Sequence, residues 1–189
     1  MHRTLGDFLT DIFQNSVEAG AKNLRVTLIQ DEKSFRMEVA DDGCGMTAEE
    51  LVRAQDPFYT DGTKHSKRRV GLGLPFLIQT AEMTGGEFGI ESKKGEGTNV
   101  KVVLPQGHVD IPPEGDWAVT LSQLFSLPGD FEAVIDRQCF GRSYQVSRKE
   151  LIEVLGSLED LEALILLKQF FLSAENEIST GINEGEQNG

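Results

Sequence analysis

The chain reads DIFQNSVEAGA at residues 11–21, VADDGCGM at 39–46, GLGLPFLIQTAEMTGG at 71–86 and GEGTNVKVVLP at 95–105. Apolar residues recur at helical spacing through the first segment, and again after the Gly-x-Gly that begins the third. The second and fourth segments adjoin stretches in which apolar and polar residues alternate, as in half-buried strands. This order of helix, strands, helix and strands predicts an α+β fold.

The expected architecture is a two-layer α/β sandwich. Helices at 5–20 and near 74–84 would cover one face of a mixed, mostly antiparallel sheet. Its strands are expected near residues 24–30, 34–40, 87–93 and 98–104. Residues 31–33 would turn the first hairpin, and Glu96-Gly97 the second.

The Asp-Gly turn in VADDGCGM has two interpretations. Gly43 and Gly45 allow a positive φ and a close backbone approach to a flat ligand. Asp41 would then offer a carboxylate acceptor to an exocyclic amino group such as that of adenine. The alternative is a plain β-turn closed by an Asx hydrogen bond, which Asp and Gly favour by themselves.

A second glycine turn, Gly71-Leu72-Gly73, lies where the next helix begins. Free backbone N–H groups and the helix dipole favour phosphate at such a place, although loop flexibility explains a Gly-x-Gly equally well. The preceding residues 60–69 contain no apolar side chain and are expected to form a mobile loop. Its cations are either a screen for a triphosphate or a solvated charge run. They are Lys64, Lys67, Arg68 and Arg69.

The first helix carries a polar row beside its buried stripe. Asp11, Asn15 and Glu18 recur at helical spacing and can point together into a cleft, although such a row is usually an exposed face. An Asn suits a hard, partly hydrated Mg²⁺ whose other ligands are phosphate oxygens. The carboxylate one turn earlier could orient or deprotonate a nucleophile.

In combination these segments resemble the N, G1 and G2 boxes of the GHKL ATPase superfamily, which includes gyrase, heat-shock chaperones, mismatch-repair ATPases and histidine kinases. The resemblance covers residues 4–105 and implies a Bergerat-type fold that binds ATP and Mg²⁺. It makes Asn15 the Mg²⁺ ligand, Asp41 the adenine ligand and Asp11 the catalytic base, and Asp56-Pro57-Phe58 resembles the start of the lid. The expected nucleotide contacts are Asn15, Asp41, Gly43, Gly45, Met46, Lys67, Arg69, Gly71, Leu72, Gly73, Leu74 and Thr98.

Within the superfamily the segment after Asn15 resembles mismatch-repair ATPases, whereas the longer stretch from Pro57 resembles the histidine-kinase catalytic domain. We therefore expect a histidine-kinase-like domain. Two residues depart from the family pattern. Asp11 replaces the usual Glu and is one methylene shorter, which predicts weak hydrolysis, and Arg69 replaces the Gly that usually opens the G2 box.

Composition agrees with a soluble, cytoplasmic protein. The net charge of −13 argues against nonspecific binding to nucleic acid or anionic membranes. Residues 1–105 hold 13 basic and 16 acidic side chains, and residues 106–189 hold 5 and 15. The two cysteines, Cys44 and Cys139, lack metal-ligand spacing. The sequence shows no transmembrane run and no signal peptide.

The second half predicts a small acidic α+β module. Residues 106–116 are expected to be a linker, 117–175 the module and 176–189 a disordered tail. A hairpin is expected from 131–138 to 143–147, followed by a helix from Arg148 that Ser147 and Glu150 cap. The helical stretch 158–178 is too apolar for one stripe, so it is either a core helix or an oligomer interface.

Three functions follow from the resemblance. The first is phosphorylation of a partner protein on His or Ser. A self-phosphorylating histidine kinase carries a helical domain with a phosphoacceptor His ahead of its ATP domain, but here only ten residues precede Asp11 and no histidine lies in a long helical pattern. Any phosphoacceptor is therefore expected on another protein. The protein could instead sense ATP with little turnover, or it could be a mismatch-repair-like ATPase, which its histidine-kinase-like second half and its acidic surface oppose.

Overall fold

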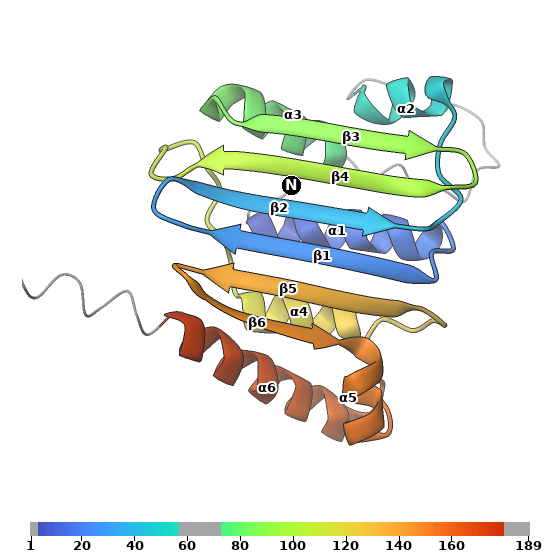
Figure 1. Cartoon of the computed structure of the whole chain (residues 1–189), viewed down its shortest axis with the longest axis vertical. Coiled ribbons are helices and arrows are strands. Elements are labelled where there is room, and N and C mark those ends of the chain that lie inside the picture. Colours follow the sequence, from blue (N-terminus) through green and yellow to red (C-terminus); the bar gives the residue numbers. More distant parts are fainter. Residues whose placement is uncertain (1–3, 57–72, 180–189) are drawn as a thin grey trace, which may run out of the picture.

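The computed structural model describes residues 4–56 and 73–179, whose strands form one six-stranded sheet in the order β3-β4-β2-β1-β5-β6. The strands are β1 (Asn23–Gln30), β2 (Ser34–Asp41), β3 (Glu87–Lys93), β4 (Gly97–Pro105), β5 (Glu132–Cys139) and β6 (Arg142–Ser147). Neighbouring strands are antiparallel, except that β1 and β5 run parallel. Figure 1 views this sheet face-on, with β3 at one edge and β6 at the other.

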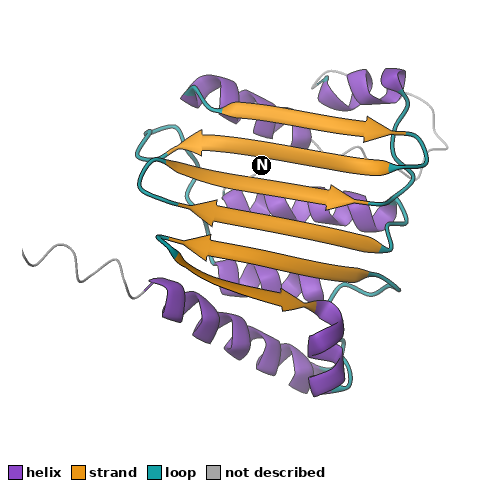
Figure 2. Ribbon diagram, in the orientation of Figure 1, coloured by secondary structure: helices purple, strands orange, loops and turns teal. Residues whose placement is uncertain are grey.

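Helices pack on one face of the sheet. The helices are α1 (Leu5–Glu18), α2 (Ala48–Gln55), α3 (Gly73–Thr84), α4 (Trp117–Phe125), α5 (Arg148–Leu155) and α6 (Leu161–Ser179). Figure 2 shows α1 and α4 behind the strands, and α6 follows the edge that β6 forms. The two-layer α+β architecture predicted from the sequence is confirmed. None of the helices within the described ranges combines the length and the apolar character needed to cross a membrane.

The buried face of each strand follows its alternating sequence. In β1, for example, Leu24, Val26 and Leu28 are buried, and the residues between them face the other side. Helix α1 buries the predicted apolar row and begins with a capping box between Thr4 and Asp7. Burial of these two rows against each other forms the layer interface that fixes α1 across the sheet.

The C-terminal half continues the same sheet. Strand β5 pairs in parallel with β1, so the hydrophobic core runs unbroken between the two halves. The hairpin of β5 and β6 and the capping box of Ser147 and Glu150 are confirmed. The domain division at residues 106–116 stays a prediction.

Three elements differ from the sequence prediction. Helix α6 continues to Ser179, and Ile178 is still buried, so residues 176–179 belong to the helix and not to the expected tail. Helices α2 and α4 were not anticipated, although Thr47 and Glu50 form a capping box at the start of α2.

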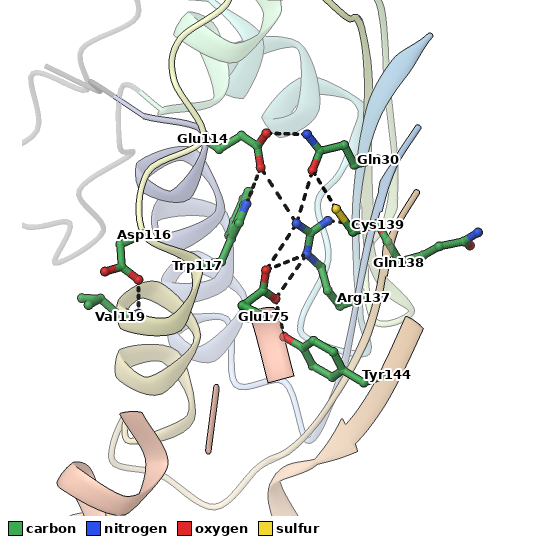
Figure 3. Close-up of polar contacts among 10 residues, drawn as sticks. All are labelled: Gln30, Glu114, Asp116, Trp117, Val119, Arg137, Gln138, Cys139, Tyr144 and Glu175. Carbon is green, nitrogen blue, oxygen red and sulfur yellow. Dashed lines mark hydrogen bonds and ion pairs between the residues drawn. The ribbon is translucent and has the colours of Figure 1, made fainter. Parts of the chain in front are cut away.

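The buried guanidinium of Arg137 in β5 contacts side chains from β1, from α6 and from the segment before α4. The Arg137 side chain is 2% exposed, and its Nε lies 3.3 Å from Glu175 Oε1 of α6. Its Nη2 donates to Gln30 Oε1 of β1 over 3.4 Å and lies 3.9 Å from Glu114 Oε2. Figure 3 shows Tyr144 approaching Glu175 from β6, and its hydroxyl donates over 2.6 Å. We call the side chains of Gln30, Glu114, Arg137, Tyr144 and Glu175 the Arg137 cluster.

The Arg137 cluster predicts a strong effect of Arg137→Ala on folding. This change leaves the partly buried Glu175 without its cation in the interior, so we expect the free energy of unfolding to fall by about 3–5 kcal/mol. Urea denaturation measures the change. Arg25→Ala is the matched control, because Arg25 pairs with Asp136 on the open face of the sheet, where its side chain is 56% exposed. That control should lose about 1 kcal/mol or less. Equal losses in the two variants would contradict the role of the cluster.

Candidate nucleotide site

The two aspartates of the first glycine turn have different environments. Asp42 accepts hydrogen bonds from the backbone N–H of Lys22 at 2.7 Å and of Asn23 at 2.8 Å. The Asn23 side chain adds a third at 2.7 Å, and this bond, followed by the backbone N–H groups, lowers the pKa of Asp42. Asp42 therefore holds the start of β1 in place.

Asp41, at the end of β2, points toward α1 instead. Its Oδ2 accepts a hydrogen bond from Ser16 Oγ at 2.6 Å, and its Oδ1 accepts one from the Gly43 N–H at 2.8 Å. Asp41 is half-buried, and Ser16 is buried. The two bonds fix the carboxylate between a helix and a glycine turn, as a preorganised acceptor requires.

Ser16 was not among the predicted site residues. A signal was present, because Ser16 lies one turn after Ile12 and places a hydroxyl in an otherwise apolar row. A small polar residue in a buried helical row needs a partner inside the fold. Here that partner is the carboxylate of Asp41.

Thr98 lies directly opposite Asp41 in the register of β2 and β4. Its hydroxyl is 2.8 Å from Ser92 Oγ, and Ser92 Oγ also accepts the N–H of Met46 at 2.9 Å. The structure thus brings Asp41, Met46 and Thr98 together at one end of the central strands. Their role as nucleotide contacts stays a prediction.

Gly45 makes a close approach to backbone. It has a φ of +55°, and a Cβ there would lie 1.9 Å from the carbonyl oxygen of Lys93. Gly97 has a φ of +107°, and its Cβ would meet the carbonyl oxygen of Asp41 at the same distance. Both glycines therefore allow two loops to meet. Gly43, for which the sequence also predicted a positive φ, does not adopt one.

Asp11 is half-buried and faces the first residue of α3. A Cβ on Gly73 would lie 1.9 Å from Asp11 Oδ2, so the missing side chain lets α3 begin against this carboxylate. Asn15 follows one turn later and is exposed, as is Glu18. The predicted polar row of α1 thus runs from the start of α3 toward solvent.

Several predicted contacts lie outside the described residues. These are Lys64, Lys67, Arg68, Arg69, Gly71, Leu72 and the lid that was expected from Pro57 onward. Leu74 is described, is partly buried and packs on the hydrophobic core.

Comparison with known proteins identifies the family. A family model described as histidine kinase-, DNA gyrase B- and HSP90-like ATPase matches residues 2–108. The chain therefore belongs to this family, and the matched residues form an ATP-binding, kinase-like domain.

Several of the similar curated proteins are bacterial kinases. Sporulation kinases E and C of Bacillus subtilis are 36% and 35% identical to this chain over 98 and 97 residues. Histidine protein kinase DivJ of Caulobacter vibrioides is 33% identical over 106 residues. These matches cover 50%, 50% and 54% of this chain, and 13%, 22% and 18% of the relatives. The chain therefore spans less than a quarter of the length of these relatives.

Part of the chain is also similar to a solved structure. The catalytic domain of histidine kinase ThkA has 22% sequence identity and a TM-score of 0.40. The match covers 53% of this chain and 64% of that domain.

The Ser16 contact predicts a measurable effect on the site. Ser16→Ala removes the donor to Asp41 Oδ2, so the carboxylate is less well held, and we expect ATP affinity to fall about two- to tenfold. Isothermal titration calorimetry measures this change. Ser122→Ala is the matched control, because Ser122 is also buried but donates to the Val119 carbonyl of α4. An unchanged affinity in Ser16→Ala would refute the positioning role.

Proposed function

We propose that residues 4–105 bind MgATP, with the adenine amino group on Asp41. The supporting observation is the Asp41 carboxylate, which Ser16 and Gly43 orient and which Thr98 faces across the β2–β4 register. Each Asp41 oxygen accepts one hydrogen bond from the protein and retains a second lone pair for a ligand donor. A half-buried carboxylate with this remaining capacity fits an exocyclic amino group.

We assign Asn15 and Asp11 to the end of the site where the phosphate groups of ATP would bind. The exposed Asn15 offers an amide oxygen, a hard ligand that suits Mg²⁺ held jointly with phosphate oxygens. Asp11 lies one turn earlier, against the start of α3. Because free N–H groups at a helix start favour phosphate, this arrangement supports a position for the carboxylate near the reacting end of the nucleotide.

The proposed reaction is transfer of the γ-phosphoryl group to a His or Ser of a partner protein. The attacking His nitrogen or Ser oxygen would form a bond to the γ-phosphorus while the bond to the bridging oxygen breaks and ADP leaves. Asn15 would help hold the Mg²⁺, and Asp11 would accept the proton of the attacking group. The likeness to sporulation kinases and DivJ supports a kinase over a mismatch-repair-like ATPase.

A specific observation favours ATP sensing with little turnover as the second candidate. The side chain of Asp11 is about 1.5 Å shorter than that of Glu, which lengthens a hydrogen bond to an attacking water beyond its effective range. On this basis ATP would bind and remain intact until a partner supplies a nucleophile.

Nucleotide binding is tested by Asp41→Ala. Loss of a charge-assisted hydrogen bond to adenine should cost about 1.5–3 kcal/mol, which is roughly ten- to a hundredfold in affinity. Calorimetry with ATP, and with GTP for base selectivity, gives the measurement. Asp136→Ala is the control, because it removes a carboxylate from β5, two strands away in the sheet. ATP affinity that is equal in Asp41→Ala and the wild type would refute the proposed adenine contact.

Turnover is tested by Asp11→Glu and Asp11→Asn. We expect very slow hydrolysis by the wild-type chain and faster hydrolysis by Asp11→Glu at nearly unchanged ATP affinity, because the longer carboxylate reaches the water. Phosphate release and calorimetry on the same samples separate the two quantities. Rapid hydrolysis by the wild type that Asp11→Asn abolishes would show instead that the protein is an ATPase in its own right.

A further inference from the structure

Helix α6 presents an apolar row to solvent. Leu161, Ile165 and Leu172 are 75%, 52% and 48% exposed, and Lys168 lies between the last two at helical spacing. We call these four residues the α6 ridge. Their spacing of four, three and four residues is that of a coiled-coil seam. The buried row of the same helix is a different one, formed by Ala163, Leu167 and Phe171.

The α6 ridge is held on a fixed support. On the other side of the helix, Phe171 packs edge-on against Phe125 of α4, with ring centroids 5.4 Å apart. Glu175 is anchored by Arg137 and Tyr144. The ridge is therefore presented without prior rearrangement, which lowers the entropic cost of binding. Exposed apolar rows on such rigid elements mark interaction surfaces.

The surroundings of the ridge are acidic. The described residues 157–179 contain five acidic side chains and a single basic one, Lys168. Asp160, Glu162 and Glu177 are exposed on or beside α6. A partner that covers the ridge must therefore combine an apolar seam with basic flanks, and it must offer an acidic group to Lys168.

We propose that the α6 ridge docks an amphipathic helix of a partner protein, with basic residues flanking its apolar seam and one acidic residue facing Lys168. This is the helix-to-helix recognition mode that an apolar seam at heptad spacing supports. The inference goes beyond the proposed nucleotide chemistry, because it rests on α6 and not on the ATP site.

A second copy of the chain fits this surface less well. In a two-fold symmetric, antiparallel pair, matching Leu161 with Leu172 of the other copy sets Ile165 against Lys168. Two lysines would then face apolar side chains without a carboxylate, and two acidic surfaces would meet. Each copy would also bring its net charge of −13.

Designed peptides test the docking. The basic peptide is about three heptads long, has Leu at its seam, one Glu placed to face Lys168, and Lys on both flanks. The acidic peptide is identical except that Glu replaces the flanking Lys. Fluorescence anisotropy with the full chain should show the basic peptide binding at least about tenfold more tightly, and more weakly as salt is added.

Matched variants locate the binding surface. Ile165→Ser/Leu172→Ser should weaken binding of the basic peptide at least about tenfold. Val52→Ser is the control, because Val52 is a 70% exposed apolar residue of α2, at the opposite end of the sheet from α6 (Figure 1). Circular dichroism and ATP calorimetry on the same proteins should be unchanged, so failure of docking and failure of nucleotide binding are seen separately.

Several results would overturn the proposal. Docking of a basic amphipathic helix would be refuted if the two peptides bound equally well or if the basic peptide did not bind. It would also be refuted if Ile165→Ser/Leu172→Ser bound the basic peptide as tightly as the wild type. A dimer in sedimentation that Ile165→Ser/Leu172→Ser dissociates would assign the ridge to a second copy. Flotation with phosphatidylcholine vesicles that depends on the same two residues would assign it to a lipid surface.

Discussion

Burial of the Arg137 guanidinium constrains the assembly of the whole molecule. A buried cation is stable only when carboxylates and carbonyl oxygens replace water around it. Here they come from α6 through Glu175, from residues 106–116 through Glu114, and from β1 through Gln30. Since Arg137 lies beside Leu28 in the β1–β5 register, these groups converge only when the parallel pair has formed. The cluster thus joins the two halves of the chain.

The same cluster reaches the nucleotide site through α1. Glu114 accepts the indole N–H of Trp117 at 2.7 Å, while its backbone carbonyl and that of Pro113 accept the first two N–H groups of α1. These bonds satisfy donors that a helix start otherwise leaves open. At its other end α1 is tied to the sheet by the bond from Ser16 to Asp41. Asp11 and Asn15 lie between these two anchors, so their positions depend on both halves of the chain.

Local signals predicted much of this structure. Alternation predicted the four strands of the first half, and the capping box at Ser147 placed the start of α5. Both features depend on contacts between residues that are close in sequence, or on side-chain periodicity, and these are visible in one chain. The grouping of Asp41 with Thr98 came instead from the family resemblance, because these two residues are far apart in sequence and meet only through the β2–β4 register.

Long-range contacts were not predicted. The pairing of β1 with β5 joins residues more than a hundred positions apart, and nothing local in either strand identifies its neighbour. The approach of Asp11 to Gly73 and the bond from Ser16 to Asp41 are of the same kind. Gly73 was assigned to a phosphate turn, and only the packed structure shows that its missing side chain also makes room for a carboxylate. Sequence reasoning finds the residue types of such a site but not the partners that orient them.

The positions of the α6 ridge and the ATP site limit how the two can act together. The α6 ridge lies along one edge of the sheet, and the strands that carry Asp41 and Thr98 lie in its interior (Figure 1). Transmission of a conformational change between them would need an element with two stable packings. The buried, fully engaged Arg137 cluster favours a single one. Tethering needs no such element, because a partner docked at α6 would have a raised effective concentration near the ATP site. That concentration depends on the length and stiffness of the partner segment between the docked helix and the phosphoacceptor. The proposed docking surface at one edge of a rigid sheet is therefore compatible with the proposed phosphotransfer by proximity, and a slow intrinsic hydrolysis would preserve ATP until that partner arrives.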